Sequence, residues 1–172
     1  MVAFNRLCDL IGAAAKLWTL LLATALFLVV LATVAMRGLL GWVPSWSEEV
    51  PRYLLIWVAF MAAACGVDLK EHIAFDYFLV KARGAAGKLM ASVVDLGIIG
   101  FGLIMLVYGV AFVQDFGPDM MESIPFTNVW YYTALPIAGG LVVLFAARDL
   151  LNIWLAPALR TARLELDSSG AE

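Results

Sequence analysis

Residues 17–36 read LWTLLLATALFLVVLATVAM, a run of 20 residues without a charge that lies between Lys16 and Arg37. A helix rises about 1.5 Å per residue, so such a run covers the roughly 30 Å hydrocarbon core of a bilayer. The run therefore predicts a first membrane-spanning helix. A secretory signal peptide is the competing interpretation, with an apolar region at 17–30 and a small-residue cleavage site at 33–35, but the stretch before Lys16 is long for one.

Three further apolar runs predict three more spanning helices. Residues 53–67 are only 15 uncharged residues, fewer than the ~18 usually needed, so this span requires its charged ends to complete the crossing. Residues 96–114 and 123–147 are uncharged over 19 and 25 residues and can span with tilt. Glycines in the third run, with Pro136 and Gly139-Gly140 in the fourth, allow close helix contacts or kinks. We expect an all-α integral membrane protein with one four-helix domain over residues 1–172, with spans at about 17–36, 50–68, 88–114 and 127–150 and a frayed tail at 155–172.

The composition agrees with a membrane protein. Of the 172 residues, 64% are hydrophobic and 15% are charged, the formal net charge is −3, and the mean hydropathy is +0.94. A soluble domain has only about 45–50% apolar residues, and this chain offers no basic surface for nucleic acid. With two cysteines, Cys8 and Cys65, and a single histidine, His72, a disulfide framework, a Cys/His metal site and a bis-histidine haem are excluded.

Lysine and arginine residues are distributed unevenly between the segments that join the predicted spans. Nine lie in the N-terminal segment, in the middle loop or near the C-terminus, and only Arg37 and Arg52 lie in the other connections. Cytoplasmic segments are enriched in these residues. We therefore expect both termini and the middle loop, 70–88, in the cytoplasm, and segments 37–51 and 114–128 on the outer side.

Ionisable side chains are scarce inside the predicted spans. Asp95 is the only one well within a span, and it lies seven residues beyond Lys88, about 10 Å along a helix and thus near the cytoplasmic boundary. An intramembrane acid suggests a proton relay or ion site, but at this depth we favour a structural acid that pairs with a Lys or Arg, or with a partner chain. The chain lacks the mid-membrane polar groups that a transporter of charged solutes needs.

The segment SWSEEVPRY at 45–53 carries a charge pattern at the start of the second span. Glu48 and Glu49 precede Arg52 by four and three residues, so all three lie on one helical face. The spacing predicts ion pairs that hold this helix start and offer a charged patch to another protein, and a solvated first turn is the alternative.

Two other patterns lie along or after the second span. Small residues recur at a spacing of four and predict close packing against a neighbouring helix of this or another chain. Asp68, His72 and Asp76 also recur every four residues and could bind a metal or move a proton, but a hydrogen-bonded joint between helix and loop is favoured. The small residues are Ala59 with Ala63 and Ala62 with Gly66.

Several of these motifs together resemble a known family. The motifs WSEEVPRY at 46–53, WVAF at 57–60, which starts at Trp57, and HIAFD at 72–76 resemble the DctQ-type small membrane subunit of tripartite ATP-independent periplasmic (TRAP) transporters. The aromatic cluster WYY at 130–132, followed by Pro136, extends the resemblance over most of the chain. The likeness is fairly specific.

The resemblance implies a multi-pass protein of the bacterial inner membrane that is neither an enzyme nor a substrate carrier. It implies that the subunit braces a large DctM-type membrane subunit, which binds sodium and moves an organic acid such as a dicarboxylate or sialic acid inward. A DctP-type periplasmic protein would capture the substrate, and the small subunit itself would need no cofactor. Subunit-interface or structural polar roles would fall to Glu48, Glu49, Arg52, Trp57, Asp68, His72, Asp76 and Asp95, and helix-packing roles to Ala59, Ala62, Ala63 and Gly66.

Two other classes of function stay open from the sequence. One is a four-helix anchor subunit of a respiratory or other membrane enzyme complex, which the single histidine makes a weak candidate for haem binding. The other is an autonomous small exporter formed as a dimer, which would need a charge near the middle of the membrane.

Overall fold

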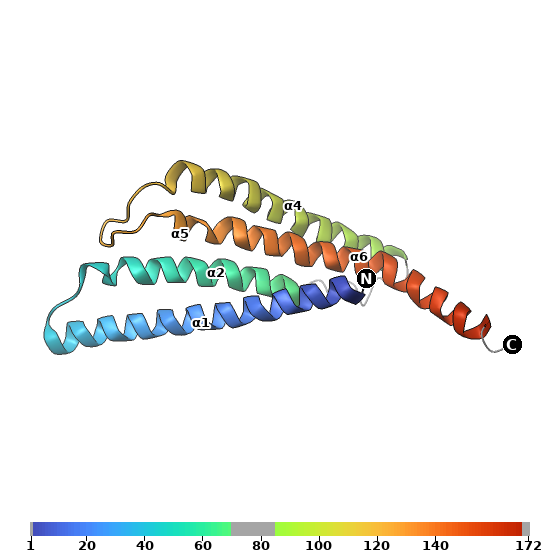
Figure 1. Ribbon diagram of the computed structural model, residues 1–172, viewed down its shortest axis with the longest axis horizontal. Coiled ribbons are helices and arrows are strands. Elements are labelled where there is room, and N and C mark those ends of the chain that lie inside the picture. Colours follow the sequence, from blue (N-terminus) through green and yellow to red (C-terminus); the bar gives the residue numbers. More distant parts are fainter. Residues whose placement is uncertain (1, 70–84, 170–172) are drawn as a thin grey trace.

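The computed structural model describes residues 2–69 and 85–169, and it is built from long helices (Figure 1). The only β-type pairing in these two ranges is an isolated bridge between Met120 and Thr127. The expected all-α fold class is therefore confirmed. In chain order the elements are α1 (Val2–Leu40), η1 (Ser45–Ser47), α2 (Glu49–Leu69), α4 (Ala85–Phe116), α5 (Val129–Tyr132) and α6 (Ala134–Ser169).

Four helical segments are long and apolar enough to cross a membrane, and they correspond to the four predicted spans. The fourth begins at Val129, two residues after the predicted start at 127. At the other bounds the helices run past the predicted limits. In α1, no strong helix breaker lies between Val2 and Leu40, and charged residues such as Lys16 favour a helix as much as apolar ones do. Gly41, with φ +63°, ends α1 in the left-handed conformation that glycine adopts without strain. The segments are Ala3–Leu40, Ser45–Leu69, Leu89–Phe116 and Val129–Leu155.

The four long helices lie side by side in a row, in the order α1, α2, α6, α4 (Figure 1). Each helix packs against its neighbour in this row, and within the described residues the backbone of α4 does not come close to the backbone of α1 or α2. Only 6% of the spanning segment in α1 is buried, against 44% of that in α6. The row is thus an open layer with α6 near its centre, and most of its apolar surface faces outward.

The most extensive helix contact joins α4 to α6, and glycines lie in it. A Cβ atom added at Gly102 would lie 3.1 Å from the carbonyl oxygen of Gly139, and one added at Gly139 would lie 2.8 Å from the backbone nitrogen of Leu106. Small residues at such contacts let membrane helices approach closely. The core beside this contact joins α2, α6 and α4 through Ala64, Met105, Ala138 and Val142.

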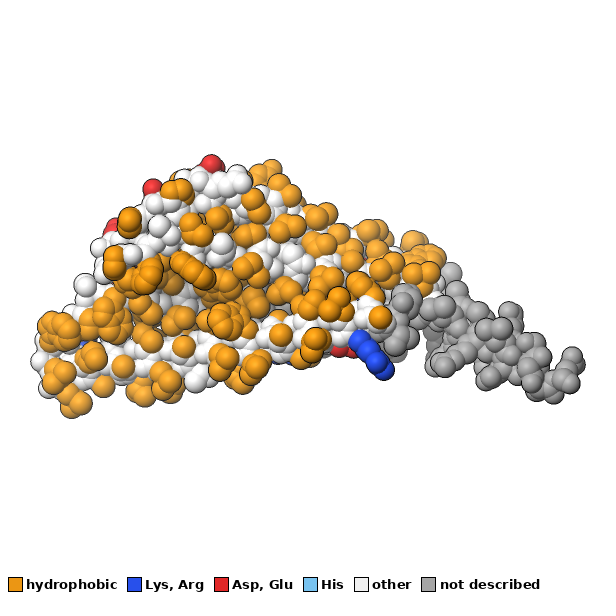
Figure 2. Space-filling view, in the orientation of Figure 1, with side chains coloured by type: hydrophobic (Ala, Val, Ile, Leu, Met, Phe, Trp, Pro, Cys, Tyr) orange, Lys and Arg blue, Asp and Glu red, His pale blue; other side chains and the backbone are white. Residues whose placement is uncertain are grey.

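Hydrophobic side chains cover most of the face drawn in Figure 2, and the charged side chains on it lie toward the two ends of the row. The exposed groups include large ones, such as Phe27, which is 66% exposed on α1, and Phe101, which is 62% exposed on α4. Apolar patches of this extent mark a surface that meets lipid or another protein.

Candidate functional site

One end of the row, which we call the Arg148 end, holds a network of ion pairs that joins three helices. Arg148 of α6 lies 2.9 Å from Asp68 of α2 and 3.3 Å from Asp9 of α1, measured from Nη1 to each Oδ1 atom. Lys16 of α1 approaches the other oxygen of Asp68 to 2.7 Å, and Arg148 Nε lies 3.2 Å from Asp149 Oδ1. The side chains of Arg148 and Asp68 are only 8% and 7% exposed. Their charges are therefore stabilised by each other rather than by water.

The network depends on how closely α1 approaches α2. Gly12 faces Asp68, and a Cβ atom added there would lie 2.7 Å from Asp68 Oδ2. Nearby, Asn5 Nδ2 donates a hydrogen bond of 3.2 Å to Asn152 Oδ1, and these polar groups line a cavity of about 380 Å³. Because two cations and three carboxylates are already paired with one another here, the site is organised to hold helices together.

The metal or proton site considered for Asp68, His72 and Asp76 receives no support from the described part of the chain. His72 and Asp76 lie outside the described residues, and Asp68 is engaged by Lys16 and Arg148. Among residues 2–69 and 85–169, no group of three acidic, histidine or cysteine side chains could hold a metal ion.

At the opposite end, which we call the Glu49 end, one buried carboxylate holds the loop between α4 and α5. Glu49 is 7% exposed, and its two oxygens accept hydrogen bonds from the backbone N–H groups of Glu122 at 3.1 Å and Ser123 at 3.0 Å. The predicted pairing of Glu49 with Arg52 is wrong, because Arg52 is exposed and forms no ion pair within the described ranges. Two fixed N–H donors bind a buried carboxylate better than a flexible, solvated guanidinium does. Glu48, the other acid of the motif, is exposed.

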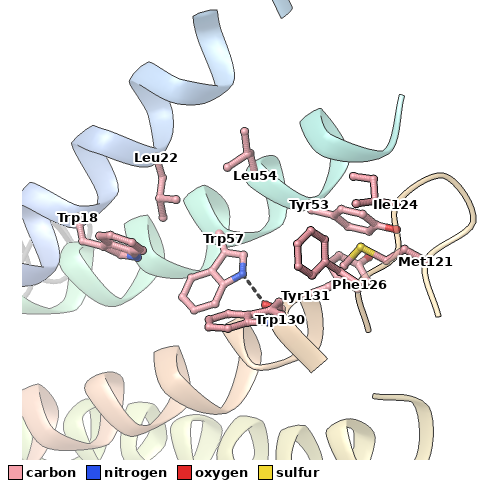
Figure 3. A pocket seen from close by; sticks show the side chains of 10 residues that line it. All are labelled: Trp18, Leu22, Tyr53, Leu54, Trp57, Met121, Ile124, Phe126, Trp130 and Tyr131. Atoms are coloured by element: carbon pink, nitrogen blue, oxygen red, sulfur yellow. Dashed lines mark hydrogen bonds between the residues drawn. The ribbon is translucent and has the colours of Figure 1, made fainter. Parts of the chain in front are cut away.

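Aromatic side chains lie beside this carboxylate and join α2, α4 and α5. Trp57 Nε1 donates a hydrogen bond of 2.8 Å to the carbonyl oxygen of Trp130, as Figure 3 shows. The ring centroids of Tyr53 and Tyr131 are 4.8 Å apart, and aromatic pairs at this distance attract beyond their buried area. These rings help to line an apolar cavity of about 460 Å³ between α1, α2 and the loop (Figure 3).

Between the two ends, the polar side chains are used within the fold. The hydroxyls of Thr19, Thr24 and Thr33 each donate 2.8 Å hydrogen bonds to the carbonyl oxygen four residues earlier in α1. Ser92 Oγ accepts a hydrogen bond of 3.0 Å from Trp154 Nε1. Each of these groups therefore has a hydrogen-bond partner within the chain. Asp95 is partly buried in α4, and its structural role stays a prediction.

The predicted small-residue face of α2 lies open in this chain. Ala59, Ala62 and Ala63 are exposed, and a Cβ atom added at Gly66 would meet no atom within 4 Å. Ala63 also lines an apolar groove of about 680 Å³ between α2 and α4. The close packing expected of these residues therefore requires a helix from outside the described residues.

The whole arrangement, with four spanning helices and a polar motif at each end, covers nearly the same residues as a known family. Residues 6–156 match the family model described as tripartite ATP-independent periplasmic transporters, DctQ component. The chain belongs to the DctQ family. As a DctQ component it is a multi-pass membrane protein and a subunit of a tripartite transporter. No curated protein matches this DctQ component.

The sequence interpretation of this DctQ chain missed most of the Arg148 end. In the sequence, Arg148 and Asp9 are charged residues of the kind found beside any span. They are 139 residues apart, and no sequence pattern predicts that they form an ion pair. One signal was present on α1, where residues 5, 9, 12 and 16 follow helical spacing and lie on one face. That face carries the polar side chains, and the glycine, that meet α2 and α6.

Proposed function

We propose that this chain is the small membrane subunit of a TRAP transporter that braces the large, DctM-type subunit and does not itself carry substrate. The open row of helices is the observation that supports this role best. Only 6% of the residues in the spanning segment of α1 are buried, so most of the apolar surface of this layer is available to a partner. The polar groups between the two ends are bonded within the fold, which leaves no ready site for an anion.

The proposed transport reaction is sodium-driven uptake of an organic acid such as a dicarboxylate or sialic acid. The large subunit would bind the sodium ions and the substrate, and a DctP-type periplasmic protein would deliver the substrate. In this scheme the small subunit lies in the bacterial inner membrane. Its Arg148 end would face the cytoplasm and its Glu49 end the periplasm, in agreement with the distribution of Lys and Arg.

The groove between α2 and α4 is the proposed contact for a helix of the large subunit. Ala63 on one wall and Gly97 on the other have little or no side chain, and an added Cβ atom at Gly97 would meet nothing within 4 Å. Val142 of α6 and Phe101 of α4 also line the groove. Small residues beside apolar side chains suit close packing of a membrane helix.

Reconstitution tests the role of the subunit. Liposomes would contain this chain alone, the large subunit alone, or both, with the capture protein and a labelled dicarboxylate or sialic acid under a sodium gradient. We expect uptake only when both membrane subunits are present. Sodium-dependent uptake by this chain alone would refute the bracing role.

A groove-filling variant tests the contact separately. Ala63→Leu should lower the yield of the large subunit that co-purifies with this chain, because the added side chain occupies the groove. Ala32→Leu is the matched control, since Ala32 is exposed on α1, which does not border the groove. Equal yields from the two variants would place the contact elsewhere.

A further inference from the structure

A second, smaller cavity lies at the Glu49 end, between α1 and the start of α2. Its volume is about 330 Å³, at the lower end of the ~300–1,000 Å³ range typical of small-molecule sites. Arg37, Ser47, Glu48 and Thr33 are its polar lining residues, and the Thr33 hydroxyl is already bonded to the carbonyl oxygen of Val29. Val30 and Val34 are among its apolar residues. The cavity thus combines a cation, a carboxylate, a hydroxyl and an apolar wall.

The polar groups of this cavity are not satisfied by one another. Arg37 and Glu48 are exposed, and no ion pair joins them in the described part of the chain. Ser47 is only 4% exposed, yet its Oγ atom has no hydrogen-bond partner there. Buried polar atoms almost always have a partner, so an exception calls for an explanation such as strain or a ligand.

The lining changes from polar to apolar with depth along α1. Arg37 lies in the last turn of α1, and Val34 and Val30 follow at about one-turn intervals toward the middle of the row. A bilayer changes in the same direction, from charged headgroups to hydrocarbon. The cavity therefore matches a molecule whose charged end lies at the membrane surface and whose apolar end enters the membrane.

We propose that this cavity binds one zwitterionic phospholipid with a phosphoethanolamine headgroup. Arg37 and the Ser47 hydroxyl donate hydrogen bonds to the phosphate, Glu48 accepts from the ammonium group, and an acyl chain lies along Val34 and Val30. A simple anion would be repelled by Glu48 and a simple cation by Arg37, so a ligand that carries both charges fits best. The inference goes beyond the bracing role and does not depend on it.

Retention of lipid by the full-length chain tests the proposal. The chain would be reconstituted in nanodiscs of equimolar phosphatidylethanolamine and phosphatidylglycerol. It would then be released from the nanodiscs, and native mass spectrometry would identify the lipids that stay bound to it. We expect one phosphatidylethanolamine to be retained in preference to phosphatidylglycerol. Arg37→Gln and Glu48→Gln should each lower its retention about tenfold, the effect of losing a charge-assisted hydrogen bond. Arg52→Gln is the matched control, because Arg52 is exposed nearby but does not line the cavity.

Ser47→Ala separates binding from folding. Removing a buried hydroxyl that lacks a partner should leave the melting temperature of the lipid-free chain unchanged or raise it, while lipid retention falls. Free phosphoethanolamine should not displace the lipid, because it lacks the acyl chain that the apolar wall holds. Equal retention by wild type, Arg37→Gln and Glu48→Gln, equal retention of phosphatidylglycerol, or displacement by free phosphoethanolamine would overturn the proposal. Loss of the lipid when the large subunit binds would assign the cavity to a protein contact and would also overturn it.

Discussion

The two ends of the helix row hold their helices together by different means. At the Arg148 end, side chains pair with side chains, and five charged groups from α1, α2 and α6 form ion pairs centred on Asp68 and Arg148. At the Glu49 end, one carboxylate binds two backbone N–H groups of a loop, and aromatic rings complete the contact. In a charge network, removing one member leaves a buried charge without its partner, which destabilises every helix that the network joins. Removing a carboxylate that binds a loop destabilises mainly that loop. We therefore expect disruption of the Arg148 end to affect the whole row and disruption of the Glu49 end to stay local.

The largest effect is expected for Arg148→Met. The substitution leaves Asp68, which is 7% exposed, without its buried partner, and loss of one member of a buried pair typically costs about 3–5 kcal/mol. The melting temperature of the purified chain, followed by intrinsic tryptophan fluorescence, should fall markedly. Adding Asp68→Asn to Arg148→Met should restore part of the loss, because neither charge is then left alone. Additive losses in the double variant would show that the two side chains do not interact.

The second effect is expected for Gly12→Ala, which changes no charge. The new methyl group would lie 2.7 Å from Asp68 Oδ2 and would push α1 away from α2, at a cost of about 1–3 kcal/mol. Gly38→Ala on the same helix is the control, since nothing lies within 4 Å of a Cβ atom there and alanine favours a helix over glycine. If both variants melted at the same temperature, close approach at Gly12 would not matter to the network.

A smaller and local effect is expected for Glu49→Gln. Glutamine keeps one acceptor oxygen but loses the charge and the second acceptor, so about 1.5–3 kcal/mol of loop stabilisation is at stake. Hydrogen exchange should speed up at the backbone amides of Glu122 and Ser123, while that of α1 should not change. Glu48→Gln, at an exposed acid, is the control. Faster exchange throughout the row would contradict a local role for Glu49.

The smallest effect is expected for Arg52→Ala. Arg52 is exposed and forms no ion pair in the described ranges, so stability should stay within about 0.5 kcal/mol of wild type. The melting temperature and the yield of co-purified large subunit should both match the wild-type values. A marked drop in stability would mean that Arg52 has a partner within the fold, and a drop in yield alone would mean that it contacts the large subunit.

The sequence predicted the helices of the fold well, but it did not predict which groups the polar side chains contact. The predicted spans lie within helices except for residues 127, 128 and 133, and glycines of α4 and α6 were expected to allow close contacts, as Gly102 and Gly139 do. The pairing of Glu49 with Arg52 was predicted from spacing alone and failed. Helical spacing shows which side chains can meet within one helix, but Glu49 binds a loop more than 70 residues away.

The sequence by itself determined that the chain has four apolar helices. In lipid, an uncharged run of membrane length is far more stable as a helix than in any other conformation open to a single segment. The sequence also determined the family, through motifs that can be read in order along the chain. Only the tertiary structure decided that the helices form an open row and that Arg148 meets Asp68, Asp9 and Asp149. The physical reason is that lipid exposes every side of each helix to similar apolar surroundings. Neighbours are then selected by close glycine contacts and by pairs of charges, and both depend on residues far apart in the sequence.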